Sequence, residues 1–481
     1  MIASGGLGAG IARRGLGPEH ADPKAVRLAP HPAGGRPAHC THRSPPVVLR
    51  PARSNRSKCP RAVVPGLAPV VTEAEEASWA REGDMGAPRD EGWLGRIGDA
   101  LARWGGGPAR HYACFLLVGA AYLAAFSGPA CDWLARAVVD VPGLLSSAVP
   151  AVSRAQWLAV ITDAVSFSGV IFVFGVMPLM DLILGRDARE APEGAATDLA
   201  YDIPQYLLVP LHLGLLACLC LRAPALMATP VAFLGAMLSA GNAGGLAVTA
   251  AHNLLHSTKP VDKLLSKVLL WSTCYMHWGQ SHLAHHVQIG TPHDPSTARF
   301  GEPLYSFLPR CIVGNFQDAI RLEKQRLVAK GQSLLSFHNR MFAWVVAPAV
   351  MLAAGWAVSG PPGVLMLLGQ AVVAVLLLHS VDYVEHYGLR RDAGDRVGPQ
   401  HSWNSDWAFS NRVFFMLQRH PDHHLHASVP YQVMKAHEGY LCLFVFLFVC
   451  LLVYLFIINL FICCLFVYLF VVDPAHCITL N

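Results

Sequence analysis

Charged residues are scarce in this sequence of 481 residues, of which only 14% are charged and 53% are apolar. The 13 cysteines include no CxxC pair, so neither a zinc ribbon nor a disulfide framework is indicated. No GxGxxG, haem-attachment CxxCH or flavin signature is present, and we therefore expect no flavin or haem in this chain. A mean hydropathy of +0.38 is typical of a membrane protein, and we expect no nucleic-acid partner.

The first 111 residues differ in composition from the rest. Residues 1–65 contain eleven Lys and Arg against two acidic residues and are rich in Pro, Gly, Ala and Ser. This composition predicts an organelle transit segment, plastid rather than mitochondrial, and the alternative is a disordered basic tail. Residues 66–111 are predicted to form a linker.

Six apolar runs follow, at residues 112–126, 157–184, 205–221, 227–249, 341–358 and 364–378. A helix needs about 20 apolar residues to cross a bilayer. We therefore predict an all-α, multi-pass membrane protein with about six transmembrane helices, in a domain of residues 112–434. If the runs pair into hairpins, the loops 185–203, 251–340 and 381–434 share one side. Their many Lys and Arg residues assign that side to the cytosol or an equivalent such as a stroma.

The chain ends in an atypical apolar tail, residues 435–481. Between 441 and 472 nearly every residue is Phe, Leu, Val, Ile, Cys or Tyr, and glycine, alanine and serine are missing from this stretch. Such low complexity sets the tail apart from the other apolar runs. It is either an additional transmembrane span or a non-coding segment read as protein.

Histidines are concentrated in the predicted loops, where residues 251–440 hold 16 of the 23 in the chain. They form an HxxxH motif, two HxxHH motifs and one single position: His252 and His256; His282, His285 and His286; His420, His423 and His424; and His386. On a helix, residues three and four apart share one face, so each motif is expected to gather its imidazoles at one point. Iron, copper, zinc and nickel all suit imidazole. The pattern predicts a metal site just beyond the membrane helices.

Other polar residues stand close to these histidines in the sequence. Metal-bound imidazoles commonly donate their second N–H to an oxygen acceptor that orients the ring. The candidates for such supporting contacts are Asp382, Glu385, His401 and Asp422. A surface salt bridge is the alternative for each acidic residue.

Eight segments in unbroken order resemble the membrane-bound non-haem di-iron alkane hydroxylases, within the fatty acid desaturase–hydroxylase superfamily. They are VMPLMDLILGRD, LVPLHLGLL, GGLAVTAAHNLLH, HLAHHVQIGTPHDPSTARFGE, LEKQRLVAKGQSLLSF, DYVEHYGLRR, HSWNSDWAFSN and LQRHPDHH, which fall within residues 170–434. The resemblance implies that the nine histidines hold two iron ions. It also implies that O2 and electrons from a rubredoxin-like carrier, or a ferredoxin in a plastid, convert a terminal C–H of an apolar alkyl substrate to a primary alcohol.

The sequence departs from the family pattern at three positions within the motifs. Asn253 replaces the glutamate of the usual HExxH motif, and Asp382 stands where the family usually has asparagine. The HLAHH motif is one residue shorter than the usual HxxxHH, which makes His282 the least secure of the nine ligands. The apolar tail replaces the family's C-terminal portion.

Three alternative functions remain open. The first is another membrane di-iron lipid enzyme, such as a desaturase, a fatty-acid ω-hydroxylase or a carotenoid hydroxylase, which product analysis would distinguish. The second is a metal transporter, which requires ligands at mid-membrane rather than in loops. The third is a paralogue that keeps the fold without catalysis.

Overall fold

A computed structural model of the chain describes residues 119, 160, 162–187 and 189–437. The predicted transit segment, the linker, nearly all of the first apolar run and residues 438–481 of the tail lie outside this part. The described chain is helical, with no strands, and an isolated bridge joins Arg186 to Trp407. The all-α prediction is therefore confirmed for these residues.

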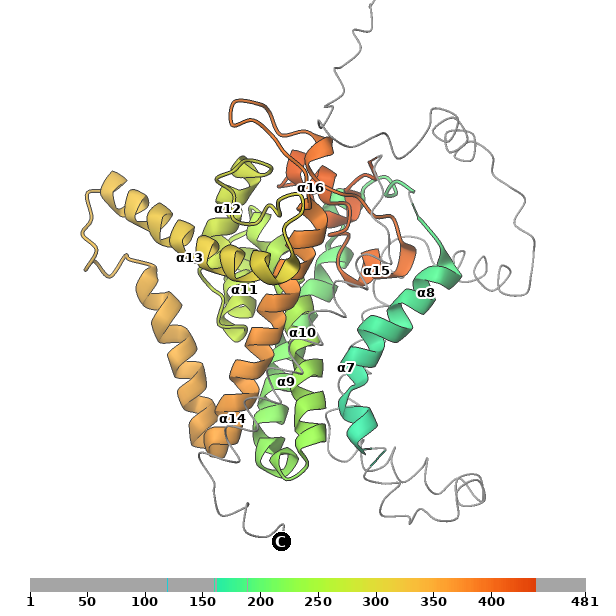
Figure 1. Cartoon of the computed structure of the whole chain (residues 1–481), viewed down its shortest axis with the longest axis vertical. Coiled ribbons are helices and arrows are strands. Elements are labelled where there is room, and N and C mark those ends of the chain that lie inside the picture. The colour runs from blue at the N-terminus through green and yellow to red at the C-terminus, as the bar shows by residue number, and fades with distance from the viewer. Residues whose placement is uncertain (1–118, 120–159, 161, 188, 438–481) are drawn as a thin grey trace, which may run out of the picture. The chain divides into compact units, whose positions relative to one another are not determined.

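The helices occur in the following order along the chain (Figure 1). They are α7 (Ser168–Ile171), the π-helix η1 (Phe172–Val176), α8 (Met177–Leu184), the 3-10 turns η2 (Ala195–Thr197) and η3 (Leu199–Tyr201), α9 (Asp202–Met227), α10 (Pro230–His256), α11 (Pro260–Ser272), α12 (Trp278–Gln288), α13 (Leu304–Ala329), α14 (Met341–His386), η4 (Pro399–His401), α15 (Ala408–Val413), α16 (His420–Leu425) and η5 (Tyr431–Val433). Pro230, Pro260 and Pro421 each stand in the first turn of a helix, where a missing N–H costs nothing.

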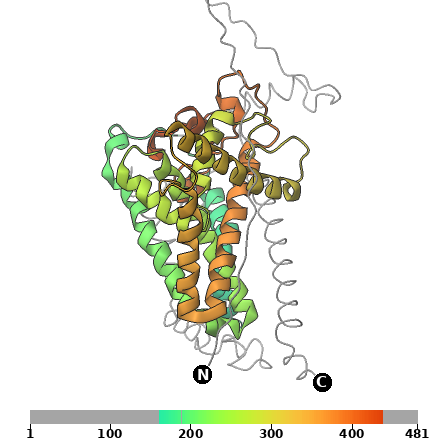
Figure 2. The same cartoon turned by 90° about the vertical axis from the view of Figure 1, so that its left-hand side faces the viewer.

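Among the residues that the structure describes, three helical segments are long and apolar enough to cross a membrane: Leu199–Met227, Pro230–His256 and Met341–His386. The last is a hairpin of two helices (Figure 2), because Gly360 interrupts α14 with a φ of 63° and a ψ of −148°. Glycine adopts such angles readily, and Pro361 and Pro362 then begin the second limb. The predicted run 205–221 falls within α9, residues 230–249 of the run 227–249 fall within α10, and the runs 341–358 and 364–378 fall in the two limbs of α14.

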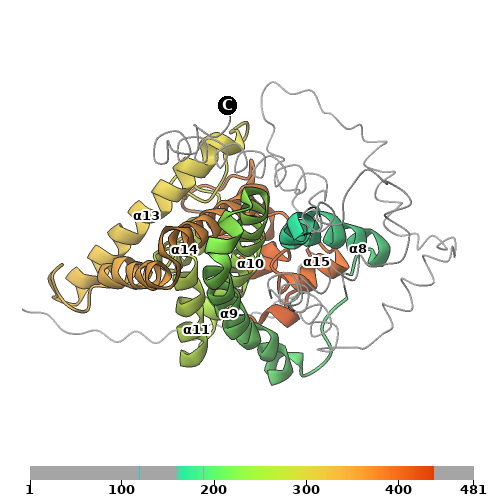
Figure 3. The same cartoon turned by 90° about the horizontal axis from the view of Figure 1, so that it is seen from below.

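Helix α10 is the centre of this bundle, with contacts to α9, α11 and α14. Of its most apolar window, 83% is buried, against 44% for α9 and 56% for α14. Figure 3 shows α13 beside α14, whereas α8 lies beyond α10 on the other side. The glycines of α10 let the neighbouring helices approach closely. A Cβ on Gly235 would lie 2.2 Å from Ser166 Oγ, and one on Gly241 would lie 2.2 Å from Val373 Cγ1. These glycines therefore serve helix packing, as in other membrane bundles.

Shorter helices and loops gather where α10 and α14 end (Figure 1). The buried carboxylate of Asp181, in the last turn of α8, accepts hydrogen bonds from the backbone N–H groups of Phe409 and Ser410, at 2.9 and 3.0 Å. Asp181 therefore satisfies two backbone donors in the first turn of α15. Asp187, just after α8, forms an ion pair with Arg412 of α15. These contacts tie the loop before α16 to the apolar helices.

Candidate metal centre

Each of the nine predicted ligands lies at or beyond an end of a long helix. His252 and His256 occupy the last turns of α10, and His386 is the last residue of α14. Helix α12 carries His282, His285 and His286, and helix α16 carries His420, His423 and His424. Because α10 ends with Ser257 in an extended conformation, and Tyr387 likewise leaves the helical region after α14, both helices present these histidines at their ends.

The structure sorts these histidines into a five-histidine cluster and a four-histidine cluster. The five-histidine cluster contains His252, His256, His282, His286 and His423. Its central atom is Nε2 of His282, which lies 3.0 Å from Nε2 of both His256 and His286. Nε2 of His423 lies 3.0 Å from Nε2 of His286. His282, the position placed in doubt by the shortened motif, is thus surrounded by the other imidazoles.

The four-histidine cluster contains His285, His386, His420 and His424. Nε2 of His420 lies 3.1 Å from Nε2 of His386 and 3.0 Å from Nε2 of His424. All four side chains are buried. The ligand atoms of each cluster lie within 4.8 Å of one another.

This geometry fits a metal ion better than a network of hydrogen bonds. A ring nitrogen carries either one hydrogen or one lone pair, so Nε2 of His282 cannot make good hydrogen bonds to two other Nε2 atoms at once. Imidazole nitrogens about 2.1 Å from one metal ion and at right angles to each other lie about 3.0 Å apart. Both ring nitrogens of His252 are buried without a hydrogen-bond partner among the described residues. A metal ion would satisfy these atoms.

The electrostatic environment keeps most of these rings neutral, as metal ligands must be. Burial, followed by repulsion from neighbouring imidazoles, lowers the pKa values of five histidines outside the membrane helices. These are His282, His286, His420, His423 and His424. Most of the site is therefore ready to bind a cation at neutral pH.

The expectation that each motif gathers its imidazoles at one point is wrong for both HxxHH motifs. His420 and His424 face the four-histidine cluster, whereas His423 faces the five-histidine cluster. In α12, His282 and His286 face the five-histidine cluster and His285 faces the other. Residues four apart share a helix face, but adjacent residues diverge by about 100°. Each HxxHH motif therefore supplies both clusters.

Of the four residues predicted to orient the metal-binding histidines, two contact one of those nine histidines. Oε2 of Glu385 lies 3.3 Å from Nε2 of His420, on the side where a metal would bind. His401 acts through its backbone, because its carbonyl oxygen lies 3.3 Å from Nδ1 of His386. Its ring instead accepts a hydrogen bond from the N–H of Gly398.

The other two candidates contact residues outside the nine. Asp382 lies 2.9 Å from Nδ1 of His379. Asp422 accepts a hydrogen bond from the backbone N–H of Lys435 and lies 2.9 Å from Nε2 of His437. Asp422 therefore fixes the chain that follows α16.

Asp294 is a supporting residue that was not predicted. Its Oδ2 lies 2.8 Å from Nδ1 of His285, and both side chains are buried. Thr297 Oγ1 donates to the same oxygen at 2.6 Å, and the N–H of Ser296 donates to Oδ1 at 3.1 Å. The only sequence signal was its place in the TPHDP segment, eight residues beyond the HxxHH motif.

Asn253, which replaces the glutamate of the usual HExxH motif, forms its hydrogen bond with a backbone group and not with one of the nine histidines. Its Nδ2 donates to the carbonyl oxygen of Phe415 at 3.4 Å. This contact links α10 to the segment just before α16. The substitution therefore leaves the positions of His252 and His256 in the cluster intact.

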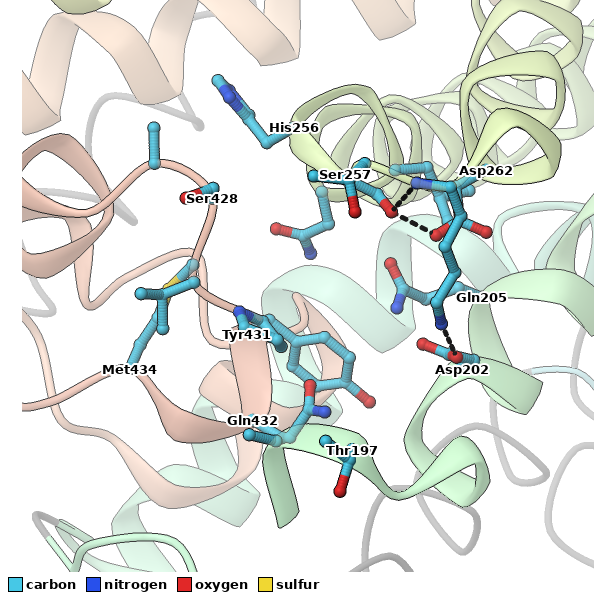
Figure 4. A pocket seen from close by; sticks show the side chains of 18 of the residues that line it. Thr197, Asp202, Gln205, His256, Ser257, Asp262, Ser428, Tyr431, Gln432 and Met434 are labelled. Carbon is cyan, nitrogen blue, oxygen red and sulfur yellow. Dashed lines mark hydrogen bonds and ion pairs between the residues drawn. The ribbon is translucent and has the colours of Figure 1, made fainter. Parts of the chain in front are cut away.

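A cavity of about 350 Å³, lined by both polar and apolar side chains, adjoins the five-histidine cluster, with His256 and His423 in its wall. Figure 4 shows Asp202, Gln205, Ser257 and Asp262 on the opposite side of the cavity from Ser428 and Met434. Ser257 Oγ donates to Asp262 at 2.5 Å.

Comparisons with known proteins agree with this site. The fatty acid desaturase family model matches residues 224–441. Alkane 1-monooxygenase 1 of Pseudomonas aeruginosa is 38% identical over 296 residues, which are 57% of this chain and 75% of that protein.

Two further relatives extend the comparison. The alkane 1-monooxygenase of Ectopseudomonas oleovorans is 36% identical over 298 residues, 59% of this chain and 74% of that protein. The xylene/toluene monooxygenase hydroxylase component of Pseudomonas putida is 28% identical over 262 residues, 52% of this chain and 69% of that protein. The chain therefore belongs to the alkane 1-monooxygenase family of membrane di-iron hydroxylases, within the wider fatty acid desaturase superfamily.

Proposed function

We propose that this chain is a membrane di-iron monooxygenase that converts the terminal C–H of an alkane or alkyl chain to a primary alcohol, with O2 as co-substrate. The observation that carries the proposal is the pair of buried histidine clusters, in which Nε2 atoms approach one another to 3.0–3.1 Å. Each cluster would hold one iron ion. When bound, the two irons supply the redox chemistry that activates O2.

The chain's own residues would hold the ligands in place and exclude water. The Asp294 carboxylate fixes the His285 ring, and the carbonyl of His401 fixes the ring of His386. Trp278 stacks on His282 with 4.4 Å between the ring centroids. Glu385 is the one carboxylate among the four predicted supporting residues that faces the metal side of a ligand ring. These contacts would set the ligand geometry before substrate arrives.

The proposed topology is six transmembrane spans with both clusters at the cytosol-equivalent face. It is supported by the clusters' position at the ends of α10 and α14 and by the Lys and Arg residues of the same loops. An apolar substrate would then reach the site from the bilayer, and electrons would reach it from the aqueous side. If residues 1–65 direct the chain to a plastid, a reporter fused to them should be imported.

The electron donor would be a separate acidic carrier of the rubredoxin or ferredoxin type. The exposed Lys263, in the first turn of α11, offers a positive charge near the clusters, whereas the neighbouring Lys259 is paired with Asp202. Attraction between such charges is screened by salt. Turnover should therefore fall as ionic strength rises, and salt-independent turnover would argue against docking on this surface.

The deciding experiment is iron content followed by product analysis. The chain from residue 66 onward is purified in detergent, with and without residues 441–481, and supplied with an alkane, O2 and a reduced carrier. About two irons per chain and a 1-alkanol product are expected. An alkene product would support a desaturase, an ω-hydroxylated product from fatty acids alone would support the ω-hydroxylase, and absence of iron from both forms would indicate a paralogue without catalysis.

A further inference from the structure

A second set of metal-ligand side chains lies outside the nine histidines. Cys311 of α13 and His379 and Asp382 of α14 bring their ligand atoms within 4.8 Å of one another. Sγ of Cys311 lies 3.2 Å from Nδ1 of His379, and Oδ2 of Asp382 lies 2.9 Å from the same nitrogen. Cys311 and His379 have no exposed surface, and Asp382 is buried.

A hydrogen bond at Nδ1 of His379 can serve only one of the two groups that lie close to this atom. Nδ1 of His379 faces both a sulfur and a carboxylate oxygen, but it can offer only one hydrogen or one lone pair. A divalent cation bound by a thiolate, a carboxylate and a neutral imidazole would satisfy all three groups and leave no net charge in the interior.

The surrounding residues orient both the imidazole and the sulfur. The hydroxyl oxygen of Tyr275 lies 2.7 Å from Nε2 of His379, which is the contact that fixes the second nitrogen of a metal-bound histidine. Asn315 Nδ2 donates to Sγ of Cys311 at 3.3 Å. Tyr275 thereby directs Nδ1 of His379 towards Cys311 and Asp382, and Asn315 supplies a donor to the sulfur.

We propose that Cys311, His379 and Asp382 form a third metal site, separate from the two histidine clusters, that takes zinc or a similar divalent cation. Zinc accepts sulfur, nitrogen and oxygen ligands in tetrahedral sites. From the usual bond lengths, sulfur and nitrogen lie about 3.5 Å apart in such a site, and nitrogen and oxygen about 3.3 Å. The sulfur–nitrogen and nitrogen–oxygen distances of 3.2 and 2.9 Å are therefore only about 0.3–0.4 Å shorter than a bound ion requires.

The state of the thiol gives the site a clear chemical signature. Burial raises the pKa of Cys311 well above its ordinary value, and the nearby charge of Asp382 raises it further. Without a cation the sulfur is therefore protonated, whereas a coordinating thiol is deprotonated. The bound ion would join α13 to α14. Ser296 connects this site to the four-histidine cluster, because its hydroxyl accepts a hydrogen bond from Asn315 and its backbone N–H donates to Asp294.

The test uses cobalt as a spectroscopic probe of sulfur ligation. The full chain is loaded with cobalt in place of its metals, and its absorption is compared with that of Cys311→Ala and of the control Cys220→Ala. Cys220 is a buried cysteine in α9, away from the site. A thiolate-to-cobalt charge-transfer band is expected in the wild type and in Cys220→Ala, and it should be lost in Cys311→Ala.

Metal analysis separates this proposal from the proposed function. Cys311→Ala and Asp382→Asn should each lose about one zinc per chain while keeping the iron of the histidine clusters, which contain no sulfur ligand. X-ray absorption of the wild-type zinc should show a sulfur neighbour at about 2.3 Å, a result that does not depend on the folding of any variant. Absence of that sulfur, or a cobalt band that persists in Cys311→Ala, would overturn the third site and leave the iron assignment untouched.

Discussion

The Nδ1 atom of His285 lies 2.8 Å from Oδ2 of Asp294, and both side chains are buried. Burial alone would raise the pKa of Asp294, but the imidazole of His285 lowers it. Burial alone would lower the pKa of His285, but the charge and hydrogen bond of Asp294 raise it. The carboxylate therefore stays ionised and fixes the ring, which leaves Nε2 free to face the four-histidine cluster.

Replacing Asp294 with asparagine should weaken metal binding. The amide keeps a hydrogen-bond acceptor but removes the charge, and loss of such a supporting contact typically lowers metal affinity about 10–100-fold. Iron retention against increasing chelator measures the effect. Asp318→Asn is the matched control, because Asp318 forms a surface pair with Arg321 on α13. Equal iron retention in the two variants would contradict this role for Asp294.

His282→Ala should remove iron from the five-histidine cluster. Nε2 of His282 has two other Nε2 atoms at 3.0 Å, so its loss leaves the centre of the cluster open. Iron content should fall to roughly half, and alcohol formation should become undetectable, because both irons are needed. His426→Ala, an exposed histidine just after α16, should keep full iron. Normal iron in His282→Ala would remove this residue from the ligand set.

Glu385→Gln and Asp422→Asn should differ in their effects, although both residues were expected to support the ligands. Glu385 faces Nε2 of His420, whereas Asp422 contacts Lys435 and His437. We expect Glu385→Gln to lower the rate of alcohol formation at least 10-fold and to reduce iron binding in the four-histidine cluster. Asp422→Asn should mainly lower the unfolding midpoint. A larger loss of iron in Asp422→Asn would reverse this assignment.

Gly241→Ala should destabilise the helix bundle. The new Cβ would lie 2.2 Å from Cγ1 of Val373, so α10 and α14 would have to move apart. Overpacking of this kind costs about 1–3 kcal/mol. Thermal unfolding in detergent measures it, with Gly214→Ala as control, because a Cβ at Gly214 meets no atom within 4 Å. Similar midpoints for the two variants would show that the interface can relax.

Acid should weaken the loop before α13 through Glu302. Burial alone would raise the pKa of Glu302, but the hydrogen bonds and charge of Arg310 lower it below its ordinary value. The stabilisation is therefore present above the unfolded pKa of about 4.3 and is lost as the pH falls below it. For a partly exposed pair we expect about 1 kcal/mol.

The measurement for this pair is the unfolding midpoint between about pH 6 and pH 3. Wild type should lose stability across this range more steeply than Glu302→Gln, because the amide does not titrate. Parallel curves would show that other carboxylates account for the acid sensitivity.

The sequence predicted which histidines assemble, but it did not predict which of them belong to the five-histidine cluster and which to the four-histidine cluster. Each motif was visible because i and i+4 positions share a helix face, and all nine residues do fall into the two clusters. The division required the positions of α12 and α16 relative to α10 and α14, which depend on long-range packing. His423 and His424 are neighbours in sequence, yet they face different clusters.

The supporting contacts were harder to predict because they come from loops and from distant turns. Asp294 reaches His285 from a loop, and the oxygen that His386 contacts belongs to the backbone of His401, for which the side-chain type carries no signal. Cys311 and His379 are 68 positions apart and belong to no local motif. Only the folded chain brings such groups together.

The position of α16 has a consequence for biosynthesis. Both clusters take ligands from this short helix near the end of the described chain: His423 completes the first, and His420 and His424 complete the second. While the ribosome is still translating residues before 420, the nascent chain offers four histidines to the first cluster and only His285 and His386 to the second. A chain terminated before residue 420 would therefore lack one histidine of the first cluster and two of the second, so neither cluster can be completed until all the preceding helices have been synthesised.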